Sequence, residues 1–169
     1  MRCFVIAAAA ALLALPALAQ VDKATEKELR ASYGKVIAAM KKKDAKGVVA
    51  QMTPDATMKE MGQTLTRAQF ESMLPQQLAV IDVQSADIAF SRLTVKNGLA
   101  NADYTETMKA KLKSPDGKSS NLETVAKYHS VFKKMGSEWK IKSSEMIGKP
   151  DVKVNGKPMT MQGGAGPRK

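Results

Sequence analysis

Cysteine is almost missing from this chain: its one thiol is Cys3, next to the amino terminus. The sequence after that position therefore offers no disulfide, no thiolate metal site and no cysteine nucleophile. Without such cross-links, the folded part of the chain must be stabilised by packing and hydrogen bonds alone.

Histidine is equally scarce, and His129 is the only one. One histidine and no nearby thiolate do not make the ligand sets that transition metals usually require. The methionine pairs Met58/Met61 and Met159/Met161 could suggest thioether copper binding, but most methionines fall at core positions, where they fill gaps. We therefore expect no metal site and no cofactor.

Acidic residues are few compared with basic ones, 16 against 27, which gives a formal net charge of +11. The excess is mostly lysine, a solvated point charge, whereas arginine carries the planar fork that reads phosphates and bases. The charge therefore indicates solubility and loose attraction to anionic surfaces, and we expect no nucleic-acid partner.

The amino terminus holds the one long apolar run. Residues 3–15 follow Arg2, and Pro16 and Ala19 come at the end of the run. This pattern is typical of a cleavable secretory signal peptide, and the run is too short to span a bilayer comfortably. An uncleaved membrane anchor is the alternative, although no stop-transfer pattern follows. We expect residues 1–19 to be removed and the remaining 169 − 19 = 150 residues to be exported, to the periplasm or outside the cell.

The first half of the exported part has helical periodicity. Apolar residues recur three or four apart over residues 22–43, which predicts an amphipathic helix. Asp44 is suited to cap a second, shorter helix, and residues 56–61 have the pattern of a short strand. Thr66 and Gln69 have capping-box spacing, which predicts the start of a third helix.

The second half has strand periodicity. Alternation of apolar and polar residues predicts four strands joined by hairpins, over residues 87–95, 99–113, 121–135 and 139–146. Beyond Ile147 the period is lost, and we expect residues 148–169 to form a flexible basic tail. Residues 22–147 should then be one α+β domain, with its helices on one face of a mostly antiparallel sheet.

Four stretches carry a family pattern: residues 44–49 after the first helix, 52–57 at the first strand, 62–70 from strand through turn to helix, and 134–141 at the closing hairpin. Over residues 25–146 their order resembles the nuclear-transport-factor-2-like superfamily, with its polyketide cyclase-like and ketosteroid isomerase-like members. The resemblance implies a cone-like fold, in which three N-terminal helices pack on a strongly curved, mostly antiparallel sheet and enclose a pocket. Members include isomerases, dehydratases, cyclases and non-catalytic modules, so the fold alone does not identify the function.

Alternation also separates the two faces of the predicted sheet. The aromatic-rich set should face the helices, with Tyr104, Tyr128, Ser130, Trp139 and Ser143 on that side, unless a bulge reverses part of the assignment. The opposite set carries His129 and the residues that we call the lysine face: Lys109, Lys111, Lys127, Lys133, Lys140 and Lys142.

Glu106 is the one charged residue of the inner set. Burying a carboxylate costs free energy unless it is paired, hydrogen-bonded or protonated. Glu106 is therefore a candidate general base with Tyr104 or Tyr128 as proton donor, or a ligand anchor. Alternatively it lies at the open mouth of the cone or pairs with a lysine or Arg92. The catalytic sets of the family's enzymes have no clean match here.

The leading hypothesis is an exported domain, without assigned chemistry, that binds a small, mainly apolar ligand in the cone. The expected wall residues are Tyr33, Met40, Phe70, Met73, Tyr104, Glu106, Met108, Tyr128, Phe132 and Trp139. One rival is an isomerase, cyclase or dehydratase with Glu106 as general base. The other is a scaffold whose lysine face binds an anionic envelope component; a homodimer stays open, although the lysines argue against a tight apolar interface.

Overall fold

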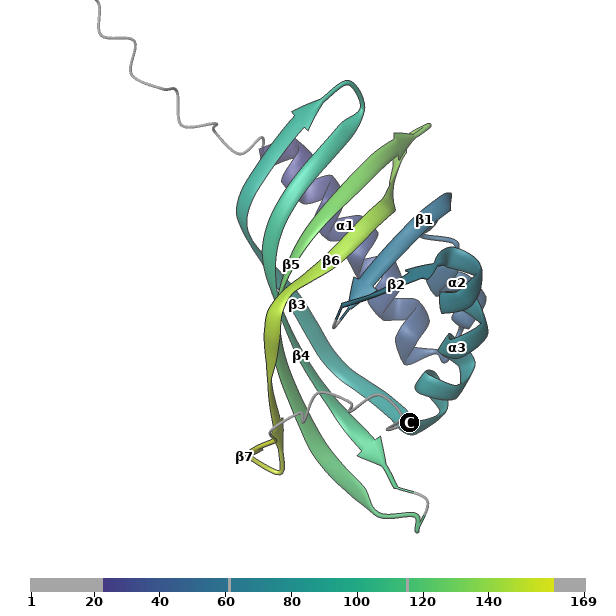
Figure 1. Cartoon of the computed structure of the whole chain (residues 1–169), viewed down its shortest axis with the longest axis vertical. Coiled ribbons are helices and arrows are strands. Elements are labelled where there is room, and N and C mark those ends of the chain that lie inside the picture. Colours follow the sequence, from purple (N-terminus) through teal and green to yellow (C-terminus); the bar gives the residue numbers. More distant parts are fainter. Residues whose placement is uncertain (1–22, 61, 115, 160–169) are drawn as a thin grey trace, which may run out of the picture.

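The computed structural model describes residues 23–60, 62–114 and 116–159, and this part of the chain forms three helices and seven strands (Figure 1). The helices are α1 (Lys23–Lys41), α2 (Ala45–Val49) and α3 (Arg67–Val80). The strands are β1 (Met52–Glu60), β2 (Gln63–Thr66), β3 (Ile81–Lys96), β4 (Leu99–Lys113), β5 (Ser119–Met135), β6 (Glu138–Val154) and β7 (Lys157–Pro158). The predicted signal peptide, residues 1–19, lies outside the described residues.

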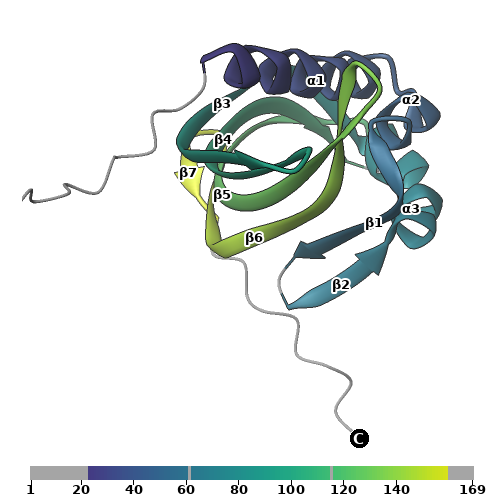
Figure 2. The ribbon, with the colours of Figure 1, turned by 90° about the horizontal axis from the view of Figure 1, so that it is seen from above.

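All seven strands belong to one sheet, in the order β2-β1-β6-β5-β4-β3, with β7 paired to β6. Strands β3 to β6 pair antiparallel through successive hairpins, whereas β1 runs parallel to β6. The long strands are strongly curved, and α1 and α3 lie on the side toward which the sheet curls (Figure 2). This arrangement confirms the expected α+β cone. None of the described helices is both long and apolar enough to cross a membrane.

The predicted helix starts are confirmed by their capping contacts. The Asp44 side chain accepts a hydrogen bond from the backbone N–H of Gly47 at 2.9 Å. At the start of α3, the Thr66 hydroxyl accepts from the Gln69 backbone, and the Gln69 side chain accepts from the Thr66 backbone in return. These caps satisfy amide groups that a helix leaves free at its first turn, and they fix where the chain turns from strand into helix.

In the part of the chain that the structure describes, buried apolar side chains form two clusters. In the first, Leu29 of α1 is fully buried against the concave face of the sheet, together with Tyr104, Phe132 and Trp139. In the second, Val49 of α2 packs with residues of α1 and α3. The Ser32 hydroxyl of α1 also donates to the backbone carbonyl of Trp139 at 2.9 Å, which ties the helix to β6.

The strand β6 continues past the point where we expected the tail to begin. The strand reaches Val154, residues 151–154 pair with β5, and Val152 is buried. The expectation of an irregular segment from residue 148 was therefore wrong up to Pro158, while residues 160–169 lie outside the described part. Gly148 has a positive φ at an irregularity in the pairing, and this local break hides the strand period in the sequence.

Replacing Leu29 with Ala should lower the free energy of unfolding by about 2–5 kcal/mol, because the change leaves a cavity in a fully buried part of the core. The matched control is Val95→Ala in β3, where the side chain is 45% exposed and the loss should be about 0.5 kcal/mol or less. Urea unfolding of both variants measures the difference, and equal losses would contradict the packing described here.

Candidate functional site

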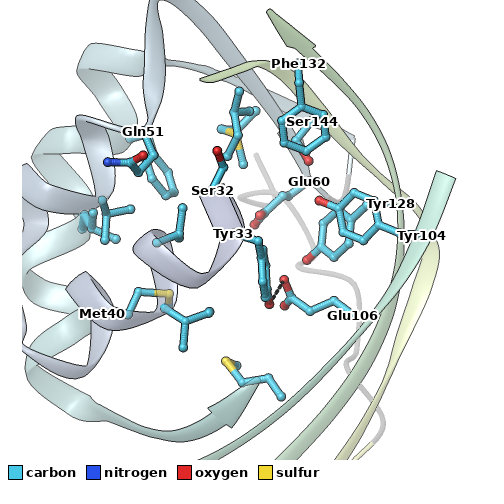
Figure 3. Close-up of a pocket in the computed structure, with 18 of the residues that line it drawn as sticks. Ser32, Tyr33, Met40, Gln51, Glu60, Tyr104, Glu106, Tyr128, Phe132 and Ser144 are labelled. Carbon is cyan, nitrogen blue, oxygen red and sulfur yellow. Dashed lines mark hydrogen bonds between the residues drawn. The ribbon is translucent and has the colours of Figure 1, made fainter. Parts of the chain in front are cut away.

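A cavity of about 220 Å³ lies between the helices and the concave face of the sheet (Figure 3). All expected wall residues except one line it: Tyr33, Met40, Phe70, Tyr104, Glu106, Met108, Tyr128, Phe132 and Trp139. The exception is Met73, which is 42% exposed. On α3 the wall is formed by Phe70, Leu74 and Gln77, one helical face, and Met73 is rotated away from it.

The alternation along the long strands places the rings inside, as predicted, but a bulge changes one residue. Val131 pairs with Ser143 while Phe132 pairs with Ile141, so β6 carries one extra residue at this point. Ser144, rather than the expected Ser143, therefore lines the cavity. The phase of the pleat reverses at the bulge, a change that the sequence pattern did not locate.

The inward hydroxyl groups form a short chain on the sheet. Tyr104 Oη lies 3.1 Å from Ser130 Oγ, which donates to Ser144 Oγ at 2.8 Å. Burial raises the pKa of Tyr104, so this side chain stays a neutral phenol. The Tyr104 and Tyr128 rings stack, with their centroids 5.6 Å apart and their planes at 25°. This side of the cavity is an aromatic wall, and the buried serine hydroxyls beside it are hydrogen-bonded.

Glu106 is held by a tyrosine of the opposite layer. The Tyr33 hydroxyl donates to Glu106 Oε2 at 2.8 Å, which joins α1 to β4 across the cavity. Burial raises the pKa of Glu106, the Tyr33 hydrogen bond opposes this shift, and the charge of Glu60 adds to it. Burial, and then the negative charge of Glu106, raise the pKa of Tyr33 above its usual range. Among the described residues, neither Arg92 nor a lysine forms an ion pair with Glu106.

Glu60 is a second carboxylate of the site, and sequence reasoning missed it. It lies at the end of β1, where the residue as a whole is exposed but its carboxylate is turned into the cavity (Figure 3). Burial of that end raises the pKa of Glu60. The sequence did contain a signal for this position. Alternate residues of a strand share one face, and on β1 this places Glu60 on the same face as Ala56 and Met58.

The outer face of the sheet is more nearly neutral than its lysines suggest. Three of them form ion pairs, Lys109 with Glu123, Lys140 with Glu138, and Lys142 with Asp55, at N–O distances of 3.6, 3.8 and 3.1 Å respectively. His129 lies on this face, as predicted, with its Nδ1 2.6 Å from Asp103 Oδ1. In the described part of the chain, no group of three or more His, Cys, Asp or Glu side chains is arranged to hold a metal ion.

Comparison with known proteins relates the chain to others through its fold. No family model matches it, and no curated protein matches it in sequence. A conserved protein from Planctomyces limnophilus superposes with a TM-score of 0.62 at 18% identity, over 72% of this chain and 94% of that one. An NTF2-like protein from Cytophaga hutchinsonii gives 0.56 at 11%, over 72% and 95%. Aln2 from Streptomyces gives 0.57 at 16%, over 75% and 93%.

The raised pKa of Glu106 predicts how stability depends on pH. The folded protein holds the proton of Glu106 more tightly than the unfolded chain does, so this carboxyl favours folding when protonated. That contribution is fully present below the unfolded pKa and is lost as the pH rises through the folded one. The Glu106→Gln variant is neutral at every pH and keeps an acceptor for Tyr33.

We therefore expect Glu106→Gln to melt near the wild-type temperature at about pH 4 and above it at about pH 8, the range in which carboxyl groups ionise. Thermal melts followed by circular dichroism measure this trend. The control is Glu123→Gln, since Glu123 lies on the outer face beside Lys109 and should give no gain at high pH. If instead the wild type melts at a higher temperature than Glu106→Gln, and this difference grows as the pH rises, the description of this site is contradicted.

Proposed function

Because the chain has the nuclear-transport-factor-2-like fold, we propose that it is a binding protein whose cone holds a small, mainly apolar molecule. The observation that carries this proposal is the cavity itself, which lies between the helices and the sheet. Its volume of about 220 Å³ is below the range of about 300–1,000 Å³ that is typical of drug-sized ligands. The ligand should therefore be small.

The lining supports an apolar ligand with one polar end. Most of the wall is aliphatic, aromatic or thioether, as at Val36, Phe70 and Met108. The polar groups include Glu106 with its partner Tyr33, which would orient a ligand at that end. A few fixed polar groups in an otherwise apolar pocket are the usual composition of a small-molecule site. That the protein acts after export stays a prediction, which rests on the sequence pattern of residues 1–19.

Acid–base chemistry on a bound molecule is the second candidate, and the environment of Glu106 favours it. A carboxylate with a raised pKa is a stronger base than an exposed one, and it lies inside the cavity. The Tyr128 hydroxyl makes no hydrogen bond to another described residue, so it is free to donate to an oxygen of the bound molecule. Together they could move a proton from carbon next to a carbonyl group.

Binding can be followed through Trp139, the only tryptophan of the chain, because it lines the cavity. We expect 1-octanol to change its emission saturably. Val36→Phe should weaken that binding by about tenfold, because the larger ring fills space that the ligand needs. Val95→Phe on the exposed part of β3 is the control and should bind as the wild type does. The proposal fails if the wild type shows no saturable response or if filling the cavity changes nothing.

Proton transfer can be tested with cyclohexanone in D₂O, with NMR following loss of its α-protons. If Glu106 is a base, the protein should accelerate the exchange and Glu106→Gln should abolish the acceleration, because a neutral amide cannot accept the proton. The variant should still bind 1-octanol, which separates chemistry from binding. Two results would contradict this candidate function. One is that the wild type exchanges the α-protons no faster than buffer alone, and the other is that Glu106→Gln exchanges them as fast as the wild type.

A further inference from the structure

The cavity has the opposite charge from the molecule around it. The chain as a whole carries a formal charge of +11, yet the described residues that line the cavity include two carboxylates, Glu60 and Glu106, and no lysine, arginine or histidine. The sign of charge therefore changes between the outer surface and the cone. Since low-dielectric walls strengthen electrostatic interactions, the interior and not the net charge should decide which ligands enter.

Neither carboxylate has a cationic partner among the described residues. The hydrogen-bond partner of Glu106 is the neutral hydroxyl of Tyr33. Lys59, the chain neighbour of Glu60, pairs instead with Glu145 at 2.7 Å. The two carboxylates are close enough for Glu60 to raise the pKa of Glu106 through its charge. A cation bound beside them would relieve this repulsion, whereas an anion would add to it.

The remaining groups also suit a cation with an apolar body. The aromatic side chains of Tyr104, Tyr128 and Trp139 line the cavity, and aromatic rings attract ammonium groups electrostatically. Gln51, which lines the same cavity, has a buried Oε1 without a hydrogen-bond donor among the described residues. The lining thus offers hydrogen-bond acceptors that a donor on the ligand could satisfy.

We propose that the cone selects a small amphiphile with a cationic amine head, with the head beside Glu60 and Glu106 and the apolar body against the aromatic wall (Figure 3). This inference rests on the proposed function, because it assumes that the cavity binds a ligand. It adds the class of ligand: a primary alkylamine rather than a neutral alcohol or a fatty acid.

Three probes with the same alkyl chain test it: octylammonium, 1-octanol and octanoate, each titrated into the full chain at neutral pH by calorimetry and by Trp139 emission. We expect octylammonium to bind at least about tenfold more tightly than 1-octanol, and octanoate most weakly, despite the positive surface that attracts it. Repeating the titrations at high salt distinguishes binding in the cavity from binding to the outer surface, because salt screens exposed charges strongly and enclosed charges much less.

The variants Glu60→Gln and Glu106→Gln, and the double variant, test whether these two carboxylates cause the preference for octylammonium. Each should lower the ratio of octylammonium affinity to 1-octanol affinity, because the amides keep size and polarity but lose the charge that attracts the ammonium group. Glu123→Gln, on the outer face beside Lys109, is the matched control and should keep the full preference. The wild-type comparison of the three probes decides the inference even if a variant fails to fold.

The outcomes separate the inference from the proposed function. If 1-octanol binds but octylammonium binds no better, the cavity is a binding site and the inference is wrong. If octanoate binds as tightly as octylammonium, or if the double variant keeps the preference, the inference is also wrong. If none of the three probes binds, both the inference and the proposed function fail.

Discussion

The pleat of the long strands sends successive side chains to opposite faces of the sheet, and the rest of the structure depends on this constraint. On β4 and β5 it turns Tyr104 and Tyr128 toward the helices and leaves Lys109 and Lys127 in water. Because the sheet is curved, side chains of its concave face line one cavity together with residues of α1 and α3. One sequence period therefore produces an apolar cone inside and a lysine face outside.

This geometry makes the carboxylates costly. A cavity gives up packing contacts, and an inward carboxylate gives up hydration, so both lower the stability of the fold. The hydrogen bond from Tyr33 to Glu106 offsets part of that cost, and it also links α1 to β4 across the space. Unpaired polar groups in a folded interior often mark a place where the protein interacts with something else. The proposals for binding and for a cationic ligand both start from this conflict.

Similarity of fold contributes less to these proposals than the lining does. The related structures share the architecture at identities below 20%, and one fold of this kind accommodates unrelated activities. The lining of the cavity has three features from which its chemistry can be argued: Glu106 bonded to a helix tyrosine, a second carboxylate at the end of β1, and a wall of stacked tyrosines. The chemistry of the cone therefore has to be argued from these side chains.

The sequence by itself determined what depends on near neighbours in the chain. The caps at Asp44 and Thr66, the hairpins, the bounds of β4 and the inward direction of Glu106 all follow from local spacing, because capping bonds and the pleat act over a few residues. The same helix and strand periodicities also predicted most of the residues that line the cavity.

Only the tertiary structure decided what depends on contacts distant in sequence. It paired Glu106 with Tyr33, brought Glu60 into the cavity through the parallel pairing of β1 with β6, and placed Ser144 inward at a bulge. It also continued β6 beyond Ile147. Registers, bulges and contacts between layers are set by packing of the whole sheet against the helices, and no local period records them.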